Sequence, residues 1–214
     1  MPQRNTVTRT IALSTLVGAL ALAAGPARAA EPTRWTTDLA HSRAEFTVSH
    51  LVVSKVWGHI PIRTLTIATA PGSAIPQRLE ATLDVAHEDT DNRVRDEDLR
   101  SETYFDVARY PTMTFRSTKV VARGADDFEV TGELTIKNVT KPVTFAGHVE
   151  GRIPEGTGTR VGYSGTLHLD RRDFGIVDQR LNASGVLLVG FDVAIGLTVE
   201  ATTPDASVRA AGAR

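Results

Sequence analysis

Residues able to do chemistry are few in this 214-residue chain, and they are scattered along it. The six histidines stand singly, without the spacing that lets two side chains on one helix or strand bind a metal together. Asp38 and His41 could form an acid–base pair, and Asp173 beside Arg172 adds a second carboxylate, if the fold brings these groups together. Charged residues at strand ends more often form salt bridges, so both interpretations stay open.

The sequence lacks the motifs of the common enzyme classes. Residues 162–165 (GYSG) do not have the spacing of a nucleophile elbow, and there is neither a phosphate-binding loop nor a dinucleotide-binding fingerprint. We therefore expect a protein that is not an enzyme, with no cofactor and no metal. A hydrolase or metal-dependent enzyme that uses His41, Asp38 or Asp173 is the rival hypothesis.

The first 29 residues have the features of a secretory signal peptide. Arg4 and Arg9 precede an apolar run over residues 11–24, and residues 27–29 (ARA) form a small-x-small cleavage site. Cleavage there removes three arginines and no acid from a chain of net charge −1, which leaves −4. We expect a soluble protein, periplasmic or secreted, with no integral membrane segment and no nucleic-acid partner. The oligomeric state stays open, with a homodimer as one alternative.

Strict alternation of apolar and polar residues dominates the rest of the chain and predicts half-buried strands. The clearest strand covers residues 191–199, and the apolar phase slips near Arg63 and Thr64, which predicts a β-bulge. Between residues 88 and 105, acids stand four positions before arginines, which favours a short helix over a charged loop. Because the chain has no cysteine, its stability must come from one hydrophobic core.

About eight such strands can close as a barrel or pack as a sandwich. Gly132, Gly147 and Gly165 fall on the apolar phase of successive strands, which indicates either barrel corners or room for a ligand against the wall. We expect one all-β domain over residues 30–203, an antiparallel eight-stranded barrel with a short helix after the fourth strand region. Residues 204–214 would form a flexible tail.

Several blocks of sequence are spread across the expected domain: residues 35–42 (WTTDLAHS), 46–51 (FTVSHL), 56–58 (VWG), 95–96 (RD), 99–101 (LRS), 105–107 (FDV), 110–115 (YPTMTF), 132–137 (GELTIK), 139–143 (VTKPV) and 172–175 (RDFG). In their residues and their order, these blocks resemble the YceI-like family of polyisoprenoid-binding periplasmic proteins. The resemblance implies a lipocalin-like barrel with a long apolar cavity. It also implies an isoprenoid or other long-chain amphiphilic lipid as partner, and no known catalysis.

The inward phase of the alternation then predicts the residues that contact the lipid chain. They are Phe46, Val48, Leu83, Phe115, Leu134, Phe145, Tyr163, Leu167, Phe191, Val193 and Ile195. For an anionic head group we expect Arg93, Arg95 and Arg100, because phosphates favour arginine donors. The alternative is a packed barrel without a cavity, which serves as a non-enzymatic interaction or stress-related module.

Overall fold

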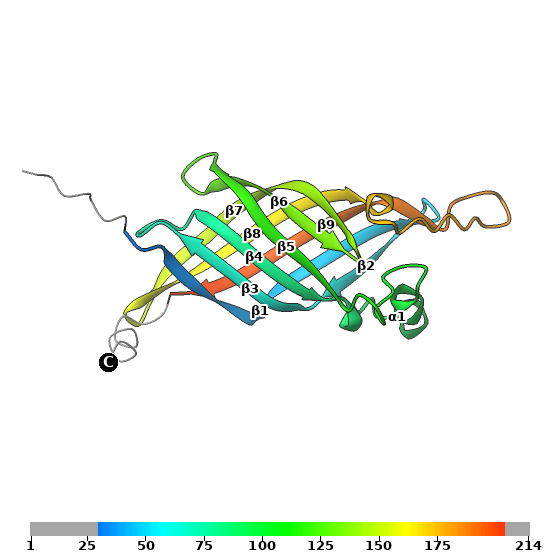
Figure 1. Ribbon diagram of the computed structural model, residues 1–214, viewed down its shortest axis with the longest axis horizontal. Helices are drawn as coiled ribbons and strands as arrows, with labels where there is room; N and C mark the ends of the chain where they lie inside the picture. Colours follow the sequence, from blue (N-terminus) through cyan, green and yellow to red (C-terminus); the bar gives the residue numbers. More distant parts are fainter. Residues whose placement is uncertain (1–29, 204–214) are drawn as a thin grey trace, which may run out of the picture.

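The strands form one antiparallel sheet that closes on itself (Figure 1). The computed structural model describes residues 30–203, so the expected leader (1–29) and the expected tail (204–214) lie outside the described residues. The elements are β1 (Thr33–His50), β2 (Ser54–Ile60), β3 (Ile62–Thr69), β4 (Pro76–Asp84), η1 (Val85–His87), α1 (Arg93–Arg100), β5 (Thr112–Ala122), β6 (Asp127–Ile136), β7 (Val139–Glu155), β8 (Gly158–Asp170), η2 (Arg171–Phe174) and β9 (Val189–Thr202).

The long strand β1 closes the barrel because it pairs along both of its edges. On one edge its first part pairs with β3 and its last part with β2, and on the other edge it pairs with β9. Only Pro61, which has no N–H to donate, separates β2 from β3. These two segments therefore act as one bent strand, and the barrel has eight strands, as the sequence predicts.

Two irregularities bend the wall. The register between β3 and β4 shifts between Ile62 and Thr64, which confirms the predicted bulge. A larger shift separates Asp38 from Arg43 where β1 pairs with β9, and the sequence pattern did not predict it. Extra residues on one strand increase its twist and turn side chains in new directions.

The predicted short helix is confirmed as α1, which follows β4. The Asn92 side chain accepts a hydrogen bond from the backbone N–H of Arg95 and caps the helix. Because α1 begins at Arg93, two of the acids expected to pair along the helix precede it, and Arg93 pairs instead with Glu97. Within the described residues, no helix is long and apolar enough to cross a membrane.

The inward glycines lie beneath aromatic rings of the preceding strand. A Cβ atom on Gly147 would stand 2.3 Å from the Phe128 ring, and one on Gly132 would stand 2.4 Å from the Phe115 ring. A Cβ on Gly165 would make ordinary contact with the next ring in this series, Phe145, at 3.5 Å. The space left by Gly132 and Gly147 is thus filled by protein side chains rather than left for a ligand.

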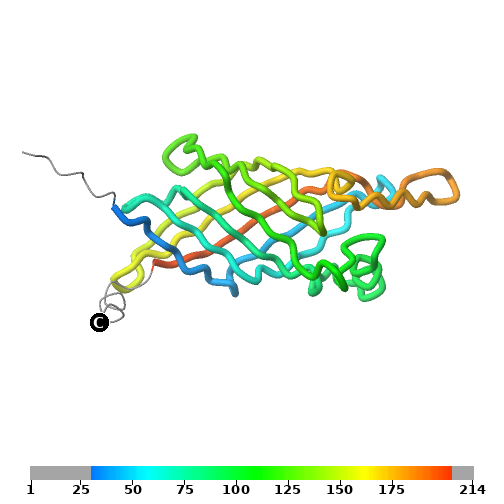
Figure 2. The backbone as a smooth tube through the Cα atoms, in the orientation of Figure 1, coloured from blue at the N-terminus to red at the C-terminus, as the bar shows by residue number. Residues whose placement is uncertain are grey.

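Two clusters of buried side chains occupy the interior, one toward each end of the barrel. One is built around Ile67, Val130 and Val161, and the other around Val85 and Phe174. The backbone trace shows that the second end carries α1 and residues 175–188 beyond the strands (Figure 2). The two ends are therefore built differently, and this difference positions the site.

Candidate ligand-binding cavity

A cavity of about 220 Å³ lies inside the barrel between the two core clusters. Its wall is almost entirely apolar, and ten of the eleven predicted contact residues line it. These ten are Phe46, Val48, Leu83, Phe115, Leu134, Phe145, Tyr163, Leu167, Val193 and Ile195. These ten face the cavity because alternate residues of a barrel strand face the interior, and the wall also contains strand residues that were not predicted, among them Ile67, Met113 and Val199.

Phe191 is the exception among the predicted wall residues, because it does not line the cavity. Its ring is covered by two guanidinium groups, with the Cζ of Arg172 at 4.0 Å and that of Arg171 at 5.0 Å from the ring centroid. Phe191 has the same phase as Val193 and Ile195, but it lies near the start of β9, beside η2. Its ring makes cation–π contacts there instead of facing a ligand.

Several lining residues were missed because they lie outside the alternating strands. Leu99 comes from α1, Tyr104 and Phe105 from the segment that follows it, and Ile176 from the segment after η2. Together they cover the end of the cavity that carries α1. No period-2 pattern marks these segments, although Leu99 and Phe105 stand in sequence blocks that carry the family resemblance.

Buried hydrogen bonds close the opposite end of the barrel. The Trp35 indole N–H donates to Thr69 Oγ1 at 3.1 Å, and the Tyr163 hydroxyl donates to the backbone carbonyl of Ala74 at 2.9 Å. Burial raises the pKa of the Tyr163 phenol, so it stays a neutral donor. These bonds satisfy the polar ends of two large rings, so both rings can be buried at this end of the barrel.

Arg171 forms a polar corner at the α1 end of the cavity. Its buried guanidinium donates to four backbone carbonyls, those of Gly190 (2.8 Å), Ile176 (2.6 Å), Asp178 (2.6 Å) and Val189 (3.0 Å). Burial lowers the pKa of Arg171 from its usual high value, and the group remains a cation. The N–H groups of Arg171 are engaged with backbone carbonyls, and these hydrogen bonds fix the segment after η2.

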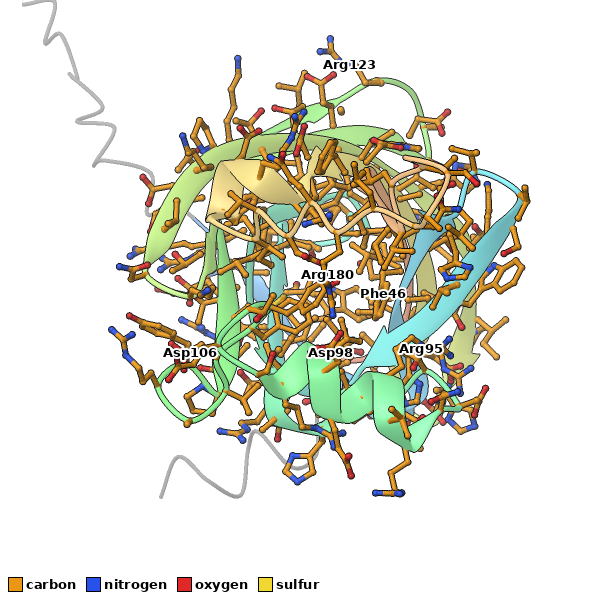
Figure 3. The ribbon with its side chains drawn as sticks, turned by 90° about the vertical axis from the view of Figure 1, so that its right-hand side faces the viewer. Phe46, Arg95, Asp98, Asp106, Arg123 and Arg180 are labelled. Atoms are coloured by element: carbon orange, nitrogen blue, oxygen red, sulfur yellow. The ribbon has the colours of Figure 1, made fainter. Side chains whose placement is uncertain are left out.

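A second polar link joins the two segments that cover the cavity. The Tyr104 hydroxyl donates to Asp178 Oδ2 at 2.6 Å, and Arg180 Nη2 donates to the same hydroxyl at 3.2 Å and to Asp98 Oδ2 at 2.7 Å. The end view shows Arg180 and Asp98 over the ring of strands, with α1 along one side (Figure 3). The cover is therefore held by these polar contacts and by the packing of its apolar side chains in the core, rather than by strand pairing.

A buried carboxyl group stands at the base of this cover. Glu88 is fully buried, and neither carboxyl oxygen accepts a hydrogen bond from the described residues. The Nε atom of Arg100 lies 3.2 Å from Glu88 Oε1, yet burial outweighs this cation and raises the pKa of Glu88 to about 7. Nearby, Thr90 donates to the buried Asp96 through its backbone N–H (3.1 Å) and its hydroxyl (2.6 Å).

The three arginines predicted to bind a head group do not line the cavity. Each contacts the chain itself: Arg93 pairs with Glu97, Arg100 with Glu88, and Arg95 donates to the hydroxyl and carbonyl of one threonine, Thr90, at 2.7 and 2.5 Å. Arg95 and Arg100 therefore join α1 to the segment that precedes it, and Arg93 forms a pair within the helix.

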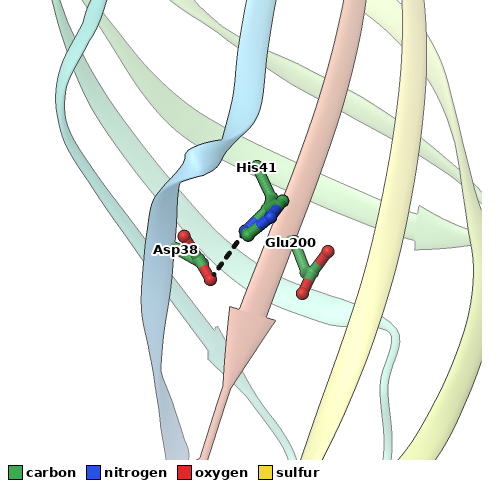
Figure 4. A group of neighbouring side chains, drawn as sticks. All are labelled: Asp38, His41 and Glu200. Atoms are coloured by element: carbon green, nitrogen blue, oxygen red, sulfur yellow. Dashed lines mark hydrogen bonds and ion pairs between the residues drawn. The ribbon is translucent and has the colours of Figure 1, made fainter.

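The structure does bring Asp38 and His41 together, on the outer face of the barrel (Figure 4). His41 Nδ1 lies 3.0 Å from Asp38 Oδ2, and Glu200 completes a group whose possible ligand atoms lie within 4.8 Å of one another. However, Arg160 donates to Asp38, Glu200 and Glu155. Hydrogen bonds with His41 and Arg160 lower the pKa of Asp38, and the bond with Asp38 raises the pKa of His41.

This group is therefore an ion-pair network that joins the β1 bulge to β8 and β9. Asp173, the other carboxylate considered for acid–base chemistry, lies on η2 and is not part of it. The salt-bridge interpretation accounts for these contacts.

Comparison with known proteins agrees with this architecture. A family model described as the YceI-like domain matches residues 35–201. The chain belongs to the YceI-like family. A YceI-like relative, the UPF0312 protein of Azotobacter vinelandii, is 36% identical over 166 residues, which cover 75% of this chain and 83% of that protein.

Solved structures have the same YceI-like fold. The YCEI protein of Campylobacter jejuni is 26% identical, with a TM-score of 0.64 over 73% of this chain and 90% of that one. A polyisoprenoid binding domain from Saccharophagus degradans is 15% identical and matches with a TM-score of 0.60 over 81% of this chain and 100% of that one. The resemblance seen in the sequence blocks is thereby confirmed.

Proposed function

We propose that this YceI-like protein binds a polyisoprenoid or a similar amphiphilic lipid in its barrel cavity, and carries or sequesters that lipid in the periplasm. The observation that carries the proposal is the apolar cavity, closed by packed rings at one end and by α1 and residues 175–188 at the other. The neighbouring structure described as a polyisoprenoid binding domain supports this class of ligand. The leader-like residues 1–29 support export.

The size of the cavity favours a slender chain. Sites for drug-sized ligands usually enclose roughly 300–1,000 Å³, so about 220 Å³ suits an unbranched or isoprenoid tail better than a bulky ring system. Each CH₂ group gains about 0.8 kcal/mol on leaving water. A bilayer offers the tail nearly the same gain, so the protein is suited to carrying a lipid through water and not to extracting it unaided.

The cavity offers no constellation for catalysis, which supports a binding role. Its ionisable lining residues besides tyrosines are Glu45 and Arg171. Glu45 pairs with Arg43 at 3.3 Å, and the guanidinium of Arg171 is occupied by four carbonyls. General acid–base chemistry needs a proton donor or acceptor within reach of the ligand, and neither residue provides one.

Native mass spectrometry of protein purified gently from the periplasm, followed by organic extraction, tests the proposal. A bound lipid of defined mass is the expected result. Protein that is empty, and that also fails to take up added isoprenoids, would overturn the proposal and favour the packed interaction module.

A pair of variants on β4 tests whether the lipid lies in the cavity. Ala81 lines the cavity and its neighbour Thr82 has the opposite phase, so Ala81→Phe adds a ring inside the barrel and Thr82→Phe adds the same ring outside. We expect Ala81→Phe to lower lipid occupancy at least about tenfold while Thr82→Phe retains it. Equal occupancy in the two variants would place the lipid elsewhere.

A further inference from the structure

Two apolar loop tips project side by side from the α1 end of the barrel. The β1–β2 turn exposes Val52 and Val53, with 78% and 82% of their surface accessible, and the segment before β9 exposes Leu181 at 58%. The backbone N–H of Leu51 donates to the carbonyl of Leu188 at 3.0 Å, which joins the tips. In Figures 1 and 2 the segment that contains Leu181 extends beyond the rest of this end.

Both tips are ordered structures and not loose loops. Leu181 and Leu187 form an isolated bridge, and the Asn182 side chain accepts hydrogen bonds from the N–H groups of Ser184 and Val186 at 2.9 Å. The other tip holds Leu51 at φ 51° and Val52 at φ 56°. The left-handed region disfavours branched side chains, and glycine or asparagine would adopt it without strain. The turn therefore keeps apolar residues at a cost in folding free energy.

The two tip segments contain no acidic residue. Residues 46–62 contain Lys55 but no aspartate or glutamate, and the one charged residue of the segment 179–190 is Arg180, whose charge is balanced by Asp98 at 2.7 Å and Asp178 at 3.0 Å. Trp57, exposed on β2, adds an aromatic ring of the kind that gathers at the membrane–water interface. A narrow apolar projection with an aromatic ring at its base and no acidic residue suits insertion into a bilayer better than contact with a flat protein face.

The tips also continue directly into the wall of the cavity. Val48 and Val189 line the cavity, and β1 and β9 pair through His50, just before the first tip, and Val189, just after the second. A bilayer bound to Val52, Val53 and Leu181 would thus face the end of the barrel that α1 covers. That arrangement would place the end covered by α1, and not the end closed by Trp35 and Tyr163, next to the source of lipid.

We propose that the tips at residues 51–53 and 181–188 dock the protein on a phospholipid bilayer, with the α1 end of the barrel toward the membrane. This inference deepens the proposed function and rests on it. Docking would shorten the path of a lipid tail between bilayer and cavity. Proximity matters here because the tail gains little free energy when it moves from the bilayer into the cavity.

Co-sedimentation of the mature chain with vesicles of equal parts phosphatidylethanolamine and phosphatidylglycerol tests the proposal. We expect Val52→Asp with Val53→Asp to lower the partition coefficient at least about tenfold. Ile153→Asp changes an exposed apolar residue on β7 beside the opposite turn, and it should partition like the unaltered protein. Unaltered protein that stays in the supernatant, or equal losses in both variants, would overturn the proposal.

Brominated phospholipid in the same vesicles provides a second readout. Trp57 is exposed near the first tip whereas Trp35 is buried in the core, so docking should quench part of the fluorescence and leave the rest. An absence of quenching would contradict docking in this orientation. Self-association of the unaltered protein that the double variant abolishes, without vesicle binding, would assign the tips to a second copy of the chain.

Isoprenoid uptake measured without vesicles separates the two proposals. Protein that takes up isoprenoid but ignores vesicles refutes docking alone. Protein that binds vesicles but stays empty refutes the lipid-carrying function and leaves the docking surface standing.

Discussion

Replacing Glu88 by glutamine should change how the stability of the protein depends on pH. The Glu88 carboxyl group is fully buried, its oxygens accept no hydrogen bond from the described residues, and its pKa is raised to about 7 from 4.5. The native state therefore binds this proton more tightly than the unfolded chain does. By linkage, the contribution of Glu88 is complete below pH 4.5 and is lost as the pH rises toward about 7.

The magnitude follows from the difference between the two pKa values. At about 1.4 kcal/mol for each tenfold change in proton affinity, the rise from 4.5 to about 7 corresponds to a loss of about 3 kcal/mol. Most of that loss, about 2 to 3 kcal/mol, falls between about pH 5 and about pH 8. Glutamine cannot ionise, and Arg100 is partly exposed, so water can solvate its guanidinium once the carboxylate is gone.

Denaturant unfolding of both proteins across this pH range is the appropriate measurement. The free energy of unfolding of Glu88→Gln, minus that of the unaltered protein, should rise by about 2 to 3 kcal/mol from about pH 5 to about pH 8. Glu97→Gln is the matched control, since Glu97 is an exposed residue of α1 that pairs with Arg93. A difference that stays constant with pH would refute the assignment of a buried, weakly partnered carboxyl group.

Three further substitutions test the contacts that shape the cavity, each by denaturant unfolding. Tyr163→Phe leaves the buried carbonyl of Ala74 without its donor and should cost about 1 to 2 kcal/mol; no loss would mean that water replaces the hydroxyl. Gly147→Ala drives a Cβ into the Phe128 ring and should cost about 1 to 3 kcal/mol, whereas an unchanged stability would show that the ring moves freely. Arg171→Lys keeps the charge but cannot reach four carbonyls, so it should cost about 2 to 4 kcal/mol and speed amide exchange in residues 176–189.

The walls of the barrel were predictable because a strand encodes its two faces locally. Val193 and Ile195 face the cavity, and Asp192 and Ala194 alternate with them because successive residues of a strand point to opposite faces. In the same way, the phase slip at Arg63 marks a bulge. Such patterns depend only on residues close in sequence. They fail at strand ends, where Phe191 keeps the inward phase but lies under two arginines of η2.

The arginines predicted to bind a head group lie away from the cavity lining for a different reason. The sequence shows the charge of Arg95 and Arg100 but not their partners. In the folded chain Thr90 and Glu88 occupy them, and both partners are buried. The tertiary structure decides whether an arginine is free to bind a ligand. The spacing of residues along a helix does not predict it.

The cover of the cavity is where long-range contacts decide the function. Tyr104 and Asp178 are separated by 74 residues, and Arg180 and Asp98 by 82, yet their hydrogen bonds join the segments that close the barrel. Tyr104 and Ile176 are also buried in the core cluster at this end, and Arg171 fixes the segment after η2, so the cover is packed as well as hydrogen-bonded. The proposed passage of a lipid tail therefore requires these contacts to separate while the paired strands keep the wall of the cavity intact.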